Sequence, residues 1–166
     1  MHILSIDTAS ENCSVSILDN DTEIKHLIST NCNTHSVCLM PMIEQIFNET
    51  NLTLNDIDLF VCDKGPGSFT GIRIGVSTVK AFSDVTQKKC VGISSLKSLA
   101  YSVTSDVQNC YICSLIDAKH DNCYCGIFEK IDNNYYKIKD YFFDSISNII
   151  EELKKINKKI IFCRKC

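Results

Sequence analysis

The stretch "DKGPGSFTGIRIGVSTVKAFSD", residues 63–84, decides the fold prediction because it joins a strand end, a glycine loop and a long helix. It holds Gly65, Gly67, Gly71 and Gly75, which are four of the six glycines in the chain. Glycine loses more backbone freedom on folding than any other residue, so this concentration needs a physical reason. Two reasons fit the pattern: a bound phosphate, or a second protein surface that approaches closely.

A phosphate would be held by the loop of Gly65 and Gly67 together with Asp7 and Thr8, which end the first predicted strand. Backbone N–H groups at a helix N-terminus bind anions, and a carboxylate beside a hydroxyl can hold a metal–phosphate. Asp7 equally fits a strand-end residue that makes local turn bonds. Pro66 stiffens the loop and no Gly-Lys-Ser/Thr follows it, so the pattern is no Walker loop and a poor dinucleotide fingerprint. The nucleotide site is therefore a weak prediction.

The close-approach alternative rests on the helix that follows the loop. Gly71 and Gly75 share one face of this helix, where each costs about 1 kcal/mol relative to Ala. Glycines at this spacing allow a neighbouring backbone to come near. The apolar residues of this helix and of the helix predicted over residues 35–50 cover more than the one stripe that a single core needs.

The surplus apolar surface predicts that both helices contact a partner, although a second domain folding back over them is the alternative. The predicted interface residues are His35, Leu39, Met42, Ile43, Ile46, Phe69, Gly71, Ile74, Gly75 and Thr78. A helical two-histidine metal site would need a histidine one turn after His35, but position 39 is leucine. His35 is therefore predicted to cap or pack rather than bind metal.

The composition fits a globular α/β chain of one medium or two small domains. The 166 residues are 45% hydrophobic and carry a net charge of −3, which gives no overall affinity for nucleic acid. The basic residues of "KKINKKIIFCRKC" leave two alternatives open, RNA contact or a solvated helix face. No segment is long and apolar enough for a membrane span, and "MHILSIDTAS" lacks signal-peptide features, so we expect a cytoplasmic protein with reduced thiols.

Eleven cysteines imitate a metal framework through the pairs Cys110 and Cys113, Cys123 and Cys125, and Cys163 and Cys166. The first four lie in sequence typical of strands. Side chains three positions apart on a strand point to opposite faces, so Cys110 and Cys113 are expected to diverge. We therefore predict small buried hydrophobic side chains and no metal.

The order of predicted elements repeats once along the chain. Three strands, a helix, a strand and a helix occupy the first part, and three strands, a helix and a strand occupy the second. The predicted strands of the second part cover residues 110–117, 123–130, 135–142 and 159–163. This repeat predicts an N-terminal domain over residues 1–105 and a C-terminal domain over residues 106–166.

Four segments, "ILSIDTA", "HSVCLMPMI", "GPGSFTGIRIGVSTVKAF" and "GISSLKSLA", resemble in that order the bacterial TsaB family of tRNA threonylcarbamoyladenosine biosynthesis proteins. The resemblance implies the actin-like ATPase (ASKHA) fold with two ribonuclease-H-like halves, the second one shortened. The chain departs from the family where it stops after "KIIFCRKC", since members usually continue. It also departs at "HDN" after Asp117, where the family loop is basic or small.

The resemblance further implies a non-catalytic partner of the threonylcarbamoyl transferase TsaD, working with the ATPase TsaE on the adenosine next to the tRNA anticodon. Family members pair through their first two long helices, as homodimers or with TsaD. TsaD-like proteins carry two metal-binding histidines in the first helix, of which only His35 is matched here. ATP and a metal ion are accordingly expected on the partner subunits, with no cofactor on this chain and with tRNA reached through the complex.

The alternative function is an actin-like nucleotide-binding enzyme acting through Asp7, Thr8 and the Gly65–Gly67 loop. A metalloprotease, the third hypothesis, lacks a second histidine and a nearby glutamate base.

Overall fold

The computed structural model describes residues 1–30, 34–103, 109–132, 134–156 and 158–165. By its contacts the chain divides into two compact units, Met1–Ile93 and Ser94–Cys166. The helix α3 (Ser95–Tyr101) belongs to the second unit, where it packs on strands of that unit's sheet. The domain boundary between residues 105 and 106 stays a prediction, because contacts alone do not test which segments fold independently.

The first unit is a five-stranded mixed sheet in the order β3-β2-β1-β4-β5, with β1, β2 and β3 antiparallel and β4 and β5 parallel to β1. Asn20 adopts a positive φ of 52° at the turn of the β2–β3 hairpin. The elements are β1 (His2–Asp7), β2 (Cys13–Asp19), β3 (Thr22–Ser29), α1 (His35–Thr50), a 3-10 turn η1 (Leu54–Asp56), β4 (Leu59–Asp63), α2 (Phe69–Thr86) and β5 (Lys89–Ile93).

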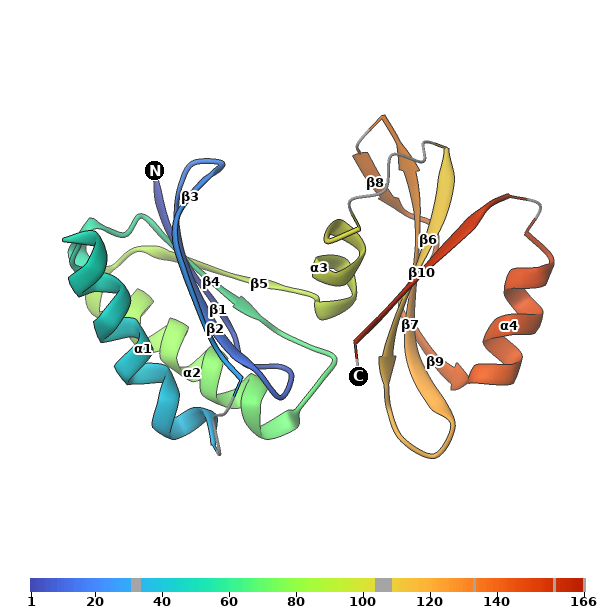
Figure 1. The fold of residues 1–166 in the computed structure, drawn as a ribbon, viewed down its shortest axis with the longest axis horizontal. Coiled ribbons are helices and arrows are strands. Elements are labelled where there is room, and N and C mark those ends of the chain that lie inside the picture. Colours follow the sequence, from blue (N-terminus) through green and yellow to red (C-terminus); the bar gives the residue numbers. More distant parts are fainter. Residues whose placement is uncertain (31–33, 104–108, 133, 157, 166) are drawn as a thin grey trace. The chain divides into compact units, whose positions relative to one another are not determined.

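Both long helices lie on the same side of this sheet (Figure 1). Alternate residues of β1 and β2 point toward the helices, as the period of two along a strand requires, and α1 covers β2 and β3 while α2 covers β4, β1 and β5. The resulting core contains Leu4, Ile6, Val15, Ile17 and Phe60 from the sheet and Leu39, Met42, Ile43, Ile46 and Val79 from the helices.

The second unit is also a mixed sheet, in the order β10-β6-β7-β8, with β9 pairing a different part of β7. Its elements are α3, β6 (Cys110–Asp117), β7 (Asn122–Ile131), β8 (Asn134–Lys137), β9 (Phe142–Ser145), α4 (Ile146–Lys154) and β10 (Ile160–Lys165). The single strand predicted over residues 135–142 is wrong. Two short strands replace it, because β7 pairs β8 through its last residues and β9 through its first ones.

The helices α3 and α4 lie on opposite sides of the second sheet (Figure 1). One core joins Cys113, Cys125 and Ile127 to the α4 residues Ile149 and Leu153. The other joins Ala100 of α3 to Cys110, Ile112 and Phe128. In each unit three antiparallel strands precede a helix and a strand that pairs in parallel with the first one, β4 with β1 and β10 with β6. In the second unit β9 stands between the three strands and the helix. The predicted repeat is therefore present in the topology.

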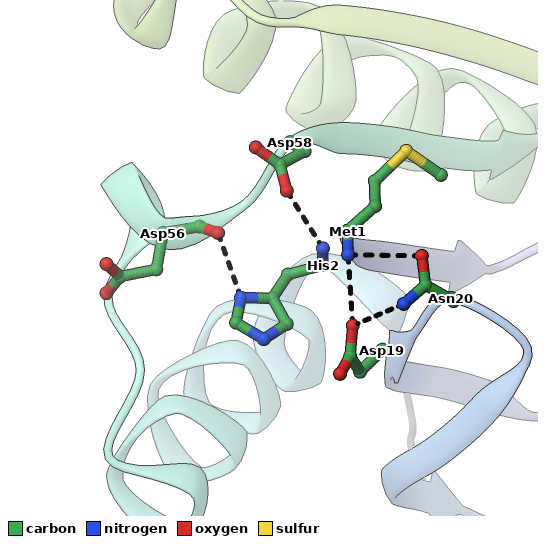
Figure 2. A network of polar contacts seen from close by, with 6 residues as sticks. All are labelled: Met1, His2, Asp19, Asn20, Asp56 and Asp58. Carbon is green, nitrogen blue, oxygen red and sulfur yellow. Dashed lines mark hydrogen bonds and ion pairs between the residues drawn. The ribbon is translucent and has the colours of Figure 1, made fainter.

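A polar network fixes the start of β1 to its neighbours (Figure 2). The N-terminal ammonium of Met1 contacts Asp19 Oδ1 at 3.0 Å and Asn20 Oδ1 at 3.2 Å, and the His2 N–H donates to Asp58 Oδ2 at 3.0 Å. These contacts lower the pKa of the carboxyl groups of Asp19 and Asp58. The groups are exposed, so the network adds little stability.

Candidate functional site

The end of β1 and the glycine loop lie together, as predicted, but their hydrogen-bonding groups serve the chain itself. Thr8 is buried, and its Oγ1 hydroxyl donates to Gly71 O at 2.7 Å. Asp7 Oδ1 accepts from the Ala9 N–H at 2.8 Å, a local turn bond of the kind that Asp commonly makes. The strand end is thus joined to the first turn of α2.

Two N–H donors of the loop are also used internally. The Gly65 N–H donates to Asp63 Oδ1 at 2.7 Å, and the Ser68 N–H donates to Ala9 O at 2.8 Å. A β-carbon built on Gly67 would lie 2.3 Å from Ala9 O, so the loop is pressed against the strand end. Nothing in this geometry favours a nucleotide at the four predicted residues.

The glycines of α2 allow a close contact within the chain and not the contact with a partner that the sequence predicted. A β-carbon at Gly71 would lie 1.9 Å from Thr8 O, and one at Gly75 would lie 2.6 Å from Thr8 Oγ1. Both glycines therefore face β1 of their own sheet, where a side chain would force the helix off the strand. The hypothesis that their bare face receives a partner's backbone is wrong, because the chain already covers that face.

Several other predicted interface residues also belong to the core. The side chains of Leu39, Met42, Ile43 and Ile46 are almost fully buried beneath α1. They cannot contact a partner while the first unit is folded, except where Leu39 forms the floor of a surface groove. The apolar surface predicted for α1 was wide because it combined the buried core residues with separate exposed apolar residues such as Met40.

A groove of about 510 Å³ lies on the outer surface between the two helices, and we call it the α1–α2 groove. From α1 it takes Ser36, Leu39 and Met40, and from α2 it takes Phe69, Thr70, Arg73, Ile74, Ser77 and Thr78. Phe69 is 75% exposed and Met40 is 52% exposed. Large apolar side chains this exposed on adjacent helices are typical of interaction surfaces. Of the predicted interface residues, Leu39, Phe69, Ile74 and Thr78 line the groove.

Met40 and Arg73 are groove residues that the sequence prediction missed. Arg73 lies one helical turn after Phe69, and its Cζ sits 5.4 Å from the centre of the Phe69 ring, a cation–π distance. The sequence prediction followed apolar residues and so left out Arg73. It could not show that α1 makes this part of α2 the wall of a groove.

His35 begins α1 beside a second hollow of about 430 Å³, which its side chain lines together with Ser10, Glu11 and Ser68. Its Nε2 donates to Ser10 O at 2.7 Å, which leaves Nδ1 buried with no hydrogen-bond partner among the described residues. In the ranges that the structure describes, no group of three or more His, Cys, Asp or Glu side chains is placed to hold a metal ion.

The cysteines of the second sheet pack as apolar side chains. Cys110 and Cys113 enter different cores on opposite faces, as predicted. Cys113 Sγ lies 3.5 Å from Cys125 Sγ, and this contact, together with burial, raises the pKa of the Cys113 thiol. Burial raises the pKa of Cys163 to about 11. The expectation of reduced thiols does not hold for Cys38, which is disulfide-bonded.

Among the described helices, none is both long enough and apolar enough to pass through a bilayer.

Sequence comparisons connect this chain to tRNA-modifying proteins. The family model for TsaD, tRNA N6-adenosine threonylcarbamoyltransferase, matches residues 29–162. The chain is 31% identical over 163 residues to the tRNA threonylcarbamoyladenosine biosynthesis protein TsaB of Buchnera aphidicola subsp. Schizaphis graminum, covering 96% of this chain and 76% of the relative. It is 29% identical over 136 residues to TsaB of Escherichia coli K12, covering 82% of this chain and 58% of the relative. The chain thus spans little more than half the length of the E. coli protein.

Comparison with solved structures bears on the fold alone. A crystal structure of a Pseudomonas aeruginosa protein with similarity to the peptidase YEAZ aligns with a TM-score of 0.82 at 19% identity, over 99% of this chain and 83% of the other. The ROK hexokinase of Thermus thermophilus aligns with a TM-score of 0.50 at 10% identity, over 81% of this chain and 47% of the other. With the two mixed sheets, these likenesses confirm the expected α/β, actin-like ATPase fold class.

Proposed function

Because the chain belongs to the TsaB family, we propose that it is the non-catalytic partner of a TsaD-type threonylcarbamoyl transferase that forms threonylcarbamoyladenosine next to the anticodon of tRNA. The complex would lie in the cytoplasm and include a TsaE-type ATPase. It would carry ATP and a metal ion on the other subunits, and this chain would meet tRNA through the complex.

The observation that carries the proposal is the α1–α2 groove. It places exposed Phe69 and Met40 over a floor of Leu39, on the long helices α1 and α2. A helix of another protein that entered this groove would bury both side chains, and full burial of such a side chain contributes about 1.5–3 kcal/mol. The same groove can pair with a second copy of the chain when the transferase is absent.

Two features favour the role of a non-catalytic partner over that of a catalytic subunit. Leu39 stands one turn after His35, where a metal-binding helix would need its second histidine. The donors of the loop at Gly65 and Ser68 are engaged with the strand end, so a nucleotide would have to break existing hydrogen bonds to bind there.

The test is co-expression of the chain with the TsaD paralogue of its organism, followed by a mass measurement of the eluted complex. Phe69→Asp places a charge in the groove and is expected to abolish co-elution without unfolding the chain, since Phe69 is 75% exposed. The matched control is Val85→Asp, because Val85 is 78% exposed on the same helix and lies outside the groove. Equal loss of pairing in both variants, or in neither, would place the interface elsewhere.

A further inference from the structure

Arg73 adds a charge to a groove whose other described lining residues are apolar or carry a hydroxyl group. It is the one charged side chain among the described residues that line the α1–α2 groove, and the same lining contains no carboxylate. No ion pair between Arg73 and a described Asp or Glu is present, and its guanidinium lies against the Phe69 ring. The aromatic contact holds the side chain over the groove instead of releasing it into solvent.

A partner that fills the groove removes water from this guanidinium. Its N–H donors are then left buried, and an unpaired buried charge costs far more than the apolar contacts around it contribute. A carboxylate satisfies the charge and accepts two parallel N–H bonds from the planar guanidinium, which fixes both position and direction.

We infer that Arg73 determines the specificity of the groove by binding a carboxylate on the partner. The partner is the transferase-type subunit, and it presents a helical surface with apolar side chains around one Asp or Glu. This inference rests on the proposed function and adds to it the chemistry that the partner must present. Phe69 contributes apolar area that many partners could use, whereas Arg73 discriminates among them by charge.

A second copy of the chain is the poorer occupant for the same reason. A two-fold pairing of groove on groove is isologous, so each surface meets its own duplicate. The two copies of Arg73 then enter one buried region, to which the described groove lining adds no anion. Arg73 therefore weakens self-pairing while it strengthens pairing with the acidic partner.

These opposite effects give a test with the purified chain and the purified TsaD-type paralogue. Arg73→Met keeps an apolar side chain on Phe69 but removes the charge. It is expected to lower the affinity for the paralogue about 30-fold or more, measured by titration calorimetry, since truncating one member of a buried charge pair costs at least ~2 kcal/mol. The same variant is expected to increase self-association, measured by sedimentation equilibrium. The matched control is Lys80→Met, an exposed cation on α2 outside the groove, which should change neither.

An Arg73→Met variant that binds the paralogue as tightly as the unmodified chain, or whose two affinities move in the same direction, overturns the inference and leaves the proposed function intact. A paralogue that does not bind the unmodified chain at all overturns the proposed function as well. Arg73→Lys separates charge from geometry: affinity between that of the unmodified chain and that of Arg73→Met supports bidentate recognition. Affinity no better than that of Arg73→Met shows that charge alone recovers nothing, and it counts against a carboxylate.

Discussion

Replacing Gly71 with alanine is expected to destabilise the first unit by about 2 kcal/mol. The added β-carbon would lie 1.9 Å from Thr8 O, a backbone atom directly after β1 that cannot rotate away, so α2 must shift. Overpacking of this kind costs up to about 3 kcal/mol, and the better helix propensity of alanine returns about 1 kcal/mol. For a unit of this size, such a loss lowers Tm by roughly 10 °C.

Gly75→Ala is the matched comparison, because its β-carbon would meet a side-chain atom, Thr8 Oγ1, at 2.6 Å. The hydroxyl can turn away by giving up its 2.7 Å hydrogen bond to Gly71 O, which costs about 1 kcal/mol. The gain in helix propensity offsets that loss, so this variant should be close to neutral.

Thr8→Ala separates the two clashes. Without Oγ1 the nearest atoms to a β-carbon at Gly75 are Ile6 Cγ2 at 3.8 Å and Thr8 Cβ at 3.9 Å, which are ordinary contacts. In the Thr8→Ala background, Gly75→Ala should therefore stabilise by about 1 kcal/mol, while Gly71→Ala should still destabilise by about 2 kcal/mol. Urea and thermal unfolding followed by far-UV circular dichroism measure both. Equal effects of the two alanines in that background would refute the assignment of these glycines to the contact of α2 with β1.

Three further outcomes are expected. Titration of the isolated chain with ATP and magnesium should give no heat of tight binding, because Gly65 and Ser68 use their N–H groups internally; micromolar affinity would revive the nucleotide site. Alkylation followed by mass spectrometry should label exposed Cys90 well before buried Cys113, whose pKa is raised by its contact with Cys125 and by burial; simultaneous labelling would contradict that packing. The pKa of the Cys163 thiol is raised from 9.0 to about 11, so its contribution to stability is complete at lower pH and is lost as pH rises from 9.0 to about 11. The free energy of unfolding should therefore fall less over this pH interval in a Cys163→Ala variant than in the unmodified chain. An equal fall in both would count against the shift.

The order of elements was readable from the sequence because local chemistry matches the final structure. The turn at Asn20 uses a residue that tolerates positive φ, and Ser68 caps α2 by accepting the Gly71 N–H at 3.2 Å. The break between β8 and β9 was not readable. No glycine or proline interrupts residues 135–142, and the division arises because β7 is long enough to pair with two strands in succession.

The candidate site was only partly predictable, since a helical wheel gives the width of an apolar surface but not what covers each part of it. The task of Gly71 depends on Thr8, which is far away in sequence and meets the helix only in the fold. The place of Arg73 depends on the neighbouring helix in the same way. Phe69 and Ile74 were found because they are apolar, and periodicity follows apolar residues.

The hydrogen bond from the Ser68 N–H to Ala9 O, just before α2, has an evolutionary consequence. Opening the loop to admit a triphosphate would release the Ser68 N–H from Ala9 and loosen the very turn that begins with Phe69. A lineage that relies on this helix for partner choice is thereby hindered from gaining an ATP pocket at the same spot. A mutation that created one activity would erode the other, and duplication of the gene offers a route by which both could persist.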